Sequence, residues 1–310
     1  MKNITKFSQF FWTSIIFFIL FCVIISPARF LQVGLDGISA WAFNVLPAIF
    51  PFMFFTRCLM CLGSVETLVK PLNKFSSTLF NCPPISIYTF AMAILSGYPV
   101  GTKMVADLYS QGKITQNDAF KMTSFCSTSG PMFIIGAVGV GMFHSAKIGY
   151  ILFFSHILGA IINGIMFRNL KKGIMKKREI ETKDKNFDIY ETIVNSSISI
   201  LSVGGIIMIF FIVIECFQPL FNIFPTQISC FLSGLFEITK GCICLSTLSP
   251  YLATILCSFV ISFGGLSTIL QSQTMLSQVK MPTKLFVFQK FCHACFSLLL
   301  SILFIAIFGL

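Results

Sequence analysis

The chain has 310 residues, of which 55% are hydrophobic and only 11% are charged, and its mean hydropathy is +0.87. Soluble domains carry about 25% charged residues, so this composition excludes an ordinary soluble globular protein. The formal net charge of +11 could indicate nucleic-acid binding, but lysines and arginines also gather in the cytoplasmic loops of membrane proteins, and we expect no nucleic-acid partner.

Long uncharged runs alternate with short charged segments along the whole chain. A membrane-spanning helix needs roughly 20 apolar residues, and nearly every run reaches that length. The pattern predicts an all-α polytopic integral membrane protein with about eight membrane segments, some of them broken or re-entrant. Residues 30–40, which contain Asp36 and two glycines, are expected to form an interfacial segment. The expected helical segments cover residues 7–25, 43–62, 85–111, 119–143, 147–167, 193–217, 227–245, 251–276 and 286–308.

Two features divide the chain. The first apolar run follows two lysines and resembles a signal peptide, but it is long for one, so we expect an uncleaved first helix with its N-terminus inside. Residues 168–191 hold 13 charged residues, eight of them Lys or Arg, and are expected to form a solvated cytoplasmic linker. The predicted parts are an N-terminal membrane helix over 1–29, a first half over 30–168, the linker over 169–191 and a second half over 192–310.

The two halves contain short echoes of each other. SQGKIT at 110–115 is similar to SQVKMP at 277–282, and NVLPAIFPFMFF at 44–55 is weakly similar to SILSVGGIIMIFF at 199–211. These echoes predict an internal two-fold repeat, which in transporters often has inverted topology. The positive-inside rule would place the lysines of residues 280–290 inside, which conflicts with strict inversion, so the orientation of the second half stays open.

Cysteine usage and motifs argue against a metal site and against an enzyme. The twelve cysteines are scattered through apolar runs, where an unpaired cysteine behaves as a small hydrophobe. The pairs Cys58/Cys61 and Cys292/Cys295 lack the second pair or the histidines of a zinc site. No GxSxG, HExxH, Walker or paired-carboxylate motif is present, so we expect no catalytic residues, no metal and no cofactor.

Three apolar runs contain clusters of glycine, proline and hydroxyl residues: AILSGYPVGTK at 93–103, CSTSGPMFIIGAVGVG at 126–141 and SFGGLSTILQSQT at 262–274. Irregular backbone at membrane depth persists only where it is buried in protein or lines a water-filled cavity. One such break alone fits a simple kink, whereas three breaks spread over both halves fit discontinuous helices that meet at a midplane site. The N–H groups freed at half-helix N-termini, together with the hydroxyls, favour an anion or a carbonyl group.

A fourth break, SGLFEITKGC at 233–242, contains Glu237. A carboxylate inside the membrane is costly and suggests binding of a proton, a cation or a polar substrate. The alternative is that Glu237 pairs with Lys240, three residues further on. Arg57 and Glu215 lie nearer segment ends, where their side chains are expected to reach the interface. The candidate substrate-binding residues are Ser96, Gly97, Pro99, Gly101, Lys103, Ser127, Thr128, Ser129, Gly130, Glu237, Thr239, Gly264, Gly265 and Ser267.

Five stretches, LSGYPVGTKMVADLY, FCSTSGPMFIIGAVG, SGLFEITKG, SFGGLS and FCHA, together resemble the YlbJ family of sporulation integral membrane proteins, within the wider nucleoside-recognition (Gate) domain membrane proteins. The resemblance covers about residues 46–308 and implies that both halves are Gate-like. It also implies a role in endospore formation in a low-GC Gram-positive bacterium. Members of the family are implicated in moving dipicolinic acid, a small planar dianion, across the outer forespore membrane, which is the localisation expected here.

Three functions stay open. The first is a transporter of a small anionic metabolite, namely dipicolinic acid. The second is a carrier of nucleosides or related solutes, in which Glu237 would bond sugar hydroxyls or a coupling cation. The third is a non-transport membrane protein that recruits other sporulation proteins through the basic linker. The expected partners are a small-molecule anionic substrate and the lipid bilayer, with a homo-oligomer or sporulation membrane partners left open.

Overall fold

A computed structural model describes residues 6–62, 67, 70–170 and 188–309. These residues form helices and connecting turns, without a strand among them, and the predicted all-α class is confirmed. Most of the predicted linker, residues 171–187, lies outside the described residues.

The helices follow one another as α1 (Lys6–Ile25), α2 (Pro27–Ser39), η1 (Ala40–Val45), α3 (Leu46–Cys61), η2 (Lys70–Leu72), α5 (Asn73–Phe75), η3 (Ser76–Phe80), α6 (Ile85–Ser96), α7 (Val100–Ser110), α8 (Gln116–Cys126), η4 (Met132–Met142), α9 (Ala146–Met166), α10 (Ile189–Phe221), α11 (Thr226–Phe236), α12 (Ile238–Leu245), α13 (Pro250–Phe263), α14 (Gly265–Met275) and α15 (Thr283–Phe308).

Five helical stretches in the described part are long and apolar enough to cross a membrane, and a bent helix pair raises the number to six. The sequence predicts about eight segments because it also counts α1, whose apolar part Gln9–Ile25 is slightly shorter than these stretches, and the pairs of short helices at the breaks. The five stretches are Pro27–Leu59, Ala146–Met166, Ile189–Phe221, Pro250–Met275 and Thr283–Phe308.

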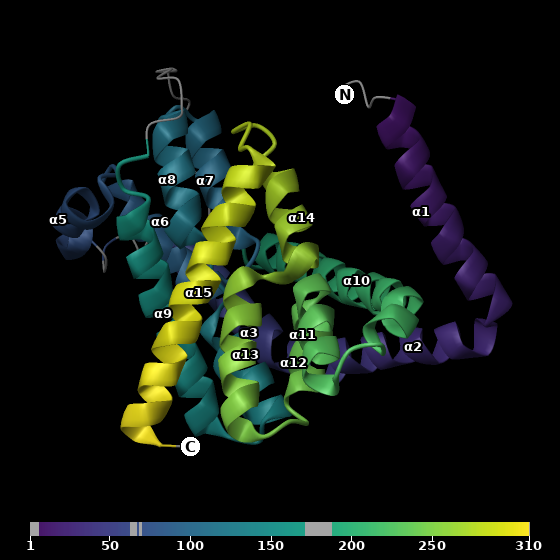
Figure 1. Cartoon of the computed structure of the whole chain (residues 1–310). Coiled ribbons are helices and arrows are strands. Elements are labelled where there is room, and N and C mark those ends of the chain that lie inside the picture. Colours follow the sequence, from purple (N-terminus) through teal and green to yellow (C-terminus); the bar gives the residue numbers. More distant parts are fainter. Residues whose placement is uncertain (1–5, 63–66, 68–69, 171–187, 310) are drawn as a thin grey trace.

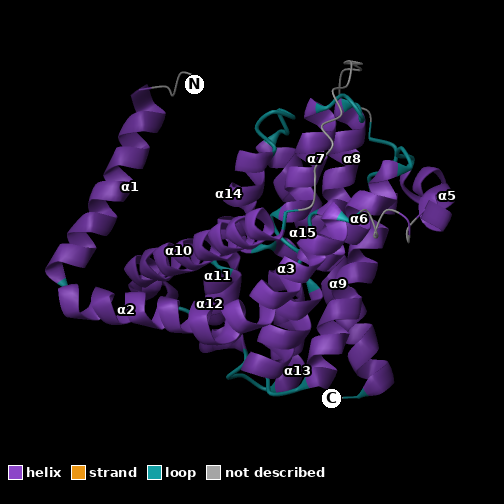
Figure 2. Cartoon of the chain, turned by 180° about the vertical axis from the view of Figure 1, so that it is seen from behind, coloured by secondary structure: helices purple, strands orange, loops and turns teal. Residues whose placement is uncertain are grey.

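The first helices lie at the edge of the molecule. Helix α1 stands apart from the helical bundle and touches it only near α2 and α10 (Figures 1 and 2). Its apolar side chains are exposed, with Phe10 73% accessible, as expected of a helix surrounded by lipid. Helix α2 packs along α10, and Arg29 forms an ion pair with Glu215 at 2.6 Å. The predicted interfacial segment is not separate, because α2 continues through η1 into α3 without interruption.

All four predicted breaks are present. In the first half, α6 and α7 meet at Gly97–Pro99, and α8 and η4 are separated by residues 127–131. In the second half, α11 and α12 meet at Glu237, and α13 and α14 meet at Gly264. Gly97 has φ +70° and Gly264 has φ +92°, a region that side chains with a Cβ rarely enter. Glycine therefore permits the turn between α6 and α7 and the interruption between α13 and α14.

The order of elements is the same in both halves. Each half has a long helix (α3 or α10), a helix pair (α6–α7 or α11–α12), a broken helix (α8–η4 or α13–α14) and a continuous helix (α9 or α15). Helices α9 and α15 pack against each other closely, since a Cβ on Gly159 would lie 2.4 Å from the Ser297 hydroxyl. The echo between residues 44–55 and 199–211 falls on corresponding helices, α3 and α10. The echo between residues 110–115 and 277–282 does not, because the first follows a helix pair and the second follows a broken helix. Duplication, with its predicted boundaries, stays a prediction.

Basic residues gather at one end of the molecule. Figure 1 shows the start of α1, the α7–α8 turn and the α14–α15 turn at the upper end, and the C-terminus at the lower end. The two turns touch, because the Gln116 side chain donates to the Val279 carbonyl at 2.8 Å. This end carries Lys113, Lys280 and Lys284. The helix pair α6–α7 enters from this end and α11–α12 from the opposite one, so cytoplasmic lysines after α14 are compatible with inverted halves.

Candidate functional site

A cavity of about 460 Å³ lies where the breaks from both halves meet. Within the first half, a Cβ on Gly97 would lie 2.7 Å from the backbone nitrogen of Gly130, so the α6–α7 tip touches the α8–η4 break. Within the second half, a Cβ on Gly265 would lie 3.2 Å from the Phe236 carbonyl, so the start of α14 touches the α11–α12 tip. The breaks thus contact one another in pairs, and the cavity lies between the pairs.

The cavity wall contains most of the predicted site residues. They come from the two helix-pair tips, from the α8–η4 break and from the first turn of α14. The predicted residues on the wall are Ser96, Gly97, Pro99, Lys103, Ser129, Gly130, Glu237, Thr239 and Ser267.

Five predicted residues lie behind the wall. Gly101 packs on the Cys126 carbonyl so closely that any Cβ would overlap it. Gly264 and Gly265 form the left-handed turn between α13 and α14. Ser127 and Thr128 are buried, and the Ser127 carbonyl accepts a hydrogen bond from the Lys290 ammonium. These five residues therefore shape the breaks and do not face the cavity. The sequence pattern identifies a break, but it does not show which of its residues face the cavity.

Two cationic side chains line the cavity. Lys103 lies at the end of the first turn of α7 and is exposed to the cavity. Arg57, on α3, donates from Nη2 to the Ser199 hydroxyl on α10 at 2.7 Å. Arg57 lies one turn before the end of α3, as expected of a residue near a segment end, and its side chain also lines the cavity. Arg57 stands in the same apolar segment as Pro47 and Pro51, and that combination could have marked it as a candidate wall residue from the sequence.

Glu237 combines a position on the wall with a structural contact. Its side chain is buried, with 4% of the residue exposed, and its Oε2 accepts from the backbone N–H of Lys240 at 2.8 Å, which caps α12. The Lys240 ammonium turns away toward Glu215, at 3.6 Å, and lies over the Phe211 ring. Of the two predicted alternatives, the structure therefore shows a helix cap on the cavity wall in place of a side-chain ion pair.

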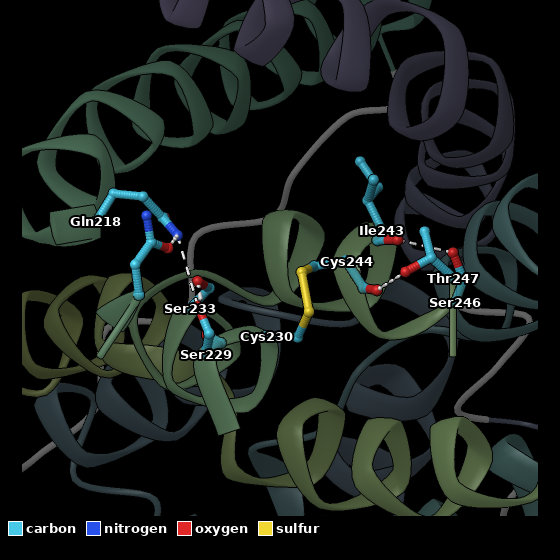
Figure 3. The surroundings of a disulfide bond; sticks show 9 residues. Gln218, Ser229, Cys230, Ser233, Ile243, Cys244, Ser246 and Thr247 are labelled. Carbon is cyan, nitrogen blue, oxygen red and sulfur yellow. Dashed lines mark hydrogen bonds between the residues drawn. A yellow bond between two sulfur atoms is a disulfide. The ribbon is translucent and has the colours of Figure 1, made fainter. Parts of the chain in front are cut away.

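A disulfide joins the two helices of the second pair. Figure 3 shows Cys230 on α11 bonded to Cys244 on α12, and the bond encloses the Glu237 tip with a sequence separation of 14. The expectation that the cysteines are unpaired is therefore wrong for these two. The sequence does not predict this disulfide, because the two cysteines come together only when α11 and α12 fold back on each other. Cys244 lies at the end of α12, far along the helix from the cavity.

Several polar wall residues escaped the sequence analysis. Tyr98 stands inside the quoted break motif, between Gly97 and Pro99, and its hydroxyl lies near the Ile261 carbonyl at 3.5 Å. The others lie within quoted stretches, 199–211 and 262–274, but those patterns do not show which of their polar side chains face the cavity. These are Ser199 and Ser202 on α10 and Thr268, Gln271 and Thr274 on α14.

The electrostatic character of the wall favours an anionic oxygen. Helices α7 and α14 both begin at the cavity, and neither has a side chain that caps its first N–H groups. Such N-termini carry about half a positive charge and donor groups that point outward. Lys103 and Arg57 add two full charges, and the serine and threonine hydroxyls add donors. Within the described residues, no group of three or more His, Cys, Asp or Glu side chains could hold a metal ion.

Comparison with known proteins agrees with this architecture. The chain is 28% identical to the sporulation integral membrane protein YlbJ of Bacillus subtilis (strain 168), over 92% of this chain and 79% of that protein. No family model and no solved structure matches the chain. The resemblance to the YlbJ proteins is confirmed over nearly the whole chain, and with its long apolar helices the protein is an integral membrane protein.

Proposed function

Because the chain is a YlbJ-like integral membrane protein, we propose that it carries a small anionic metabolite, dipicolinate, across the outer forespore membrane during endospore formation. The observation that supports this function is the cavity between the helix breaks, with two cations and two uncapped helix N-termini on its wall. In this proposal the protein moves the solute without changing it chemically, and it is not an enzyme.

The proposed ligand fits the chemistry of the wall. A cavity of about 460 Å³ falls within the usual range of small-molecule sites, about 300–1,000 Å³. Each helix N-terminus contributes about 0.3–1 kcal/mol toward an anion, and more where it is desolvated. A dianion with two carboxylates can engage Lys103 and Arg57 together, whereas a neutral solute can only accept hydrogen bonds from them and gains no ion pair.

In this proposal the solute enters from the end of the molecule toward which the cavity extends. Along α14 the wall runs from Ser267 to Met275, the last residue before the α14–α15 turn, and along α7 it runs to Lys103. Helices α12 and η4 run toward the other end of the molecule, and each contributes only its first turn to the wall. The cavity therefore extends toward the basic end, which the positive-inside rule assigns to the cytoplasm. In a sporulating cell that compartment is the mother cell.

The disulfide supports the same orientation. Disulfides persist in oxidising compartments and are rare in the cytosol. Cys230 and Cys244 lie toward the base of the α11–α12 pair, which is the end away from the basic turns. The disulfide therefore joins α11 and α12 at the non-cytoplasmic end of the molecule in this proposal. An oxidising compartment on that side would maintain the bond.

One observation favours a second candidate, a nucleoside carrier. Glu237, a hydrogen-bond acceptor, lies on the wall beside hydroxyl groups and could bond sugar hydroxyls. Uptake of labelled dipicolinate into proteoliposomes, with unlabelled nucleosides as competitors, separates the two. Dipicolinate uptake that nucleosides do not inhibit supports our proposal, and nucleoside uptake without dipicolinate uptake refutes it.

A test in cells addresses the non-transport alternative. Spores of a deletion strain should contain little dipicolinate, and a wild-type copy should restore it. A copy with residues 169–191 replaced by a neutral linker of equal length should also restore it. If linker replacement abolishes restoration while Ser96, Ser129 and Glu237 variants still restore dipicolinate, the linker-recruitment function is correct and the carrier function is wrong.

A further inference from the structure

A lysine is buried in the middle of the bundle, behind the cavity wall. Lys290 lies in the second turn of α15 and is only 2% exposed. Its ammonium donates to the Ser127 carbonyl at 2.8 Å and to the Tyr98 hydroxyl, and it lies 4.6 Å from the centre of the Tyr98 ring. None of the ion pairs of the described residues includes it. A buried charge is costly unless something of opposite sign compensates it.

The compensation comes from helix C-termini. Ser127 is the C-cap residue of α8, and its carbonyl is one of the groups that the end of a helix leaves without an internal partner. Gly264 is the C-cap residue of α13, and a Cβ there would lie 3.4 Å from Cε of Lys290. A helix C-terminus carries about −0.5 elementary charge, so the end of α8, whose carbonyl accepts from the ammonium, compensates part of the charge of the lysine. Tyr98 adds the face of its ring and its hydroxyl oxygen.

The same layer is held by a histidine. His156 accepts from the Ser129 N–H at 2.9 Å and bonds the Ser262 hydroxyl at 2.8 Å, so its ring connects the two broken helices beside the lysine. His293, which lies 4.6 Å from His156 ring to ring, bonds the His156 carbonyl. The lysine thus sits in an ordered polar layer between the first-half and second-half breaks.

In membrane carriers, unwound carbonyls and half-helix C-terminal ends are the groups that coordinate a coupling sodium ion. Here the lysine ammonium already occupies such a position. We propose that Lys290 is a tethered cation that takes the place of a mobile coupling ion, so that solute movement through the cavity needs no sodium gradient. The statement about coupling rests on the proposed carrier function. Whether the ammonium occupies a cation-binding position can be tested without any solute.

The test uses full-length protein in lipid nanodiscs and thermal unfolding in choline, sodium and potassium chloride at equal concentration. Lys290→Ala leaves the cation-binding position empty, Lys290→Met fills it without a charge, and Lys284→Ala removes an exposed lysine from the same helix. The wild type and Lys284→Ala should unfold at the same temperature in all three salts. Lys290→Ala should unfold several degrees lower in choline chloride and regain most of that loss in sodium chloride. Lys290→Met should stay low in every salt.

Two results would overturn the proposal. One is a Lys290→Ala protein with the same unfolding temperature in all three salts, because a metal ion then cannot replace the ammonium. The other is a wild type that sodium itself stabilises or whose dipicolinate uptake into proteoliposomes stops when choline replaces sodium. Wild-type uptake that continues unchanged in choline supports the proposal even if Lys290→Ala cannot be purified. An absence of dipicolinate uptake in every medium refutes the carrier function, and the unfolding series still decides the role of Lys290.

Discussion

The contact between Gly97 and Gly130 gives the sharpest prediction. Gly97 has φ +70°, and a Cβ there would lie 2.7 Å from the Gly130 nitrogen. In Gly97→Ala the backbone conformation at φ +70° and ψ −165°, which is essentially restricted to glycine, costs about 1–3 kcal/mol. The contact must also lengthen by roughly 0.7 Å to reach the 3.4 Å at which ordinary contact begins, and overpacking of this kind costs about 1–3 kcal/mol.

Together these effects raise the energy of the closed contact between the two breaks by about 2–6 kcal/mol. Each 1.4 kcal/mol is a factor of ten in an equilibrium constant, so dipicolinate binding should weaken at least tenfold. Isothermal titration of the purified protein measures that affinity, and uptake into proteoliposomes should fall in parallel. Gly97→Leu should be worse than Leu95→Ala, since the leucine truncation leaves the backbone contact intact.

Gly205→Ala is the matched control. Gly205 lies in α10 with nothing within 4 Å of its Cβ position, and alanine favours a helix by about 0.5–1 kcal/mol over glycine. This variant should therefore bind dipicolinate as the wild type does and unfold no more readily. If Gly97→Ala binds dipicolinate as tightly as Gly205→Ala, the close approach of the two breaks does not shape the site, and the breaks are simple kinks.

Three further predictions concern the cavity and the helix pair below it. Lys103→Gln should weaken dipicolinate binding by about 1 kcal/mol, or about fivefold, whereas Lys113→Gln at the α7–α8 turn should not, and equal affinities in titration would exclude Lys103 from the site. Glu237→Gln should insert into membranes normally, because the amide oxygen still accepts from the capped N–H, but its solute uptake should fall severalfold; wild-type uptake would remove Glu237 from the site. Replacing Cys230 and Cys244 by serine should lower the free energy of unfolding by roughly 3 kcal/mol, as measured by denaturant titration, and an unchanged value would show that the bond does not form.

The breaks could be predicted from sequence because their cause is local. Glycine at positive φ and proline without an N–H are residue properties, and hydrocarbon allows few reasons for a chain to contain them. The four quoted motifs therefore coincide with the four observed breaks. The identity of the wall residues depends on packing, which is why Gly101 lies against Cys126 while its neighbour Lys103 reaches the cavity.

Other features could not be predicted because they depend on contacts between distant segments. The Cys230–Cys244 bond requires α11 and α12 to fold back on each other, and nothing in either apolar helix indicates that they do. Arg57 reaches the cavity because α10 supplies Ser199 beside it, 142 residues along the chain. Lys290 gave no signal beyond one lysine at the start of an apolar run, which usually marks a membrane interface.

A broken helix in the membrane creates two ends of opposite polarity at the same depth. The cationic character of the cavity wall and the burial of Lys290 both follow from that fact. The N-terminal ends of α7 and α14 face the cavity, where they favour an anion. The C-terminal end of α8 faces the other way and holds the ammonium of Lys290 through the Ser127 carbonyl, and the C-terminal end of α13 packs against the Cε of the same side chain. The α13–α14 break lies at both sites, and the α6–α7 break touches the α8–η4 break through Gly97 and Gly130, so the ammonium that holds the end of α8 also supports the start of α7. Loss of Lys290 should therefore weaken anion binding in the cavity even though its ammonium lies behind the wall.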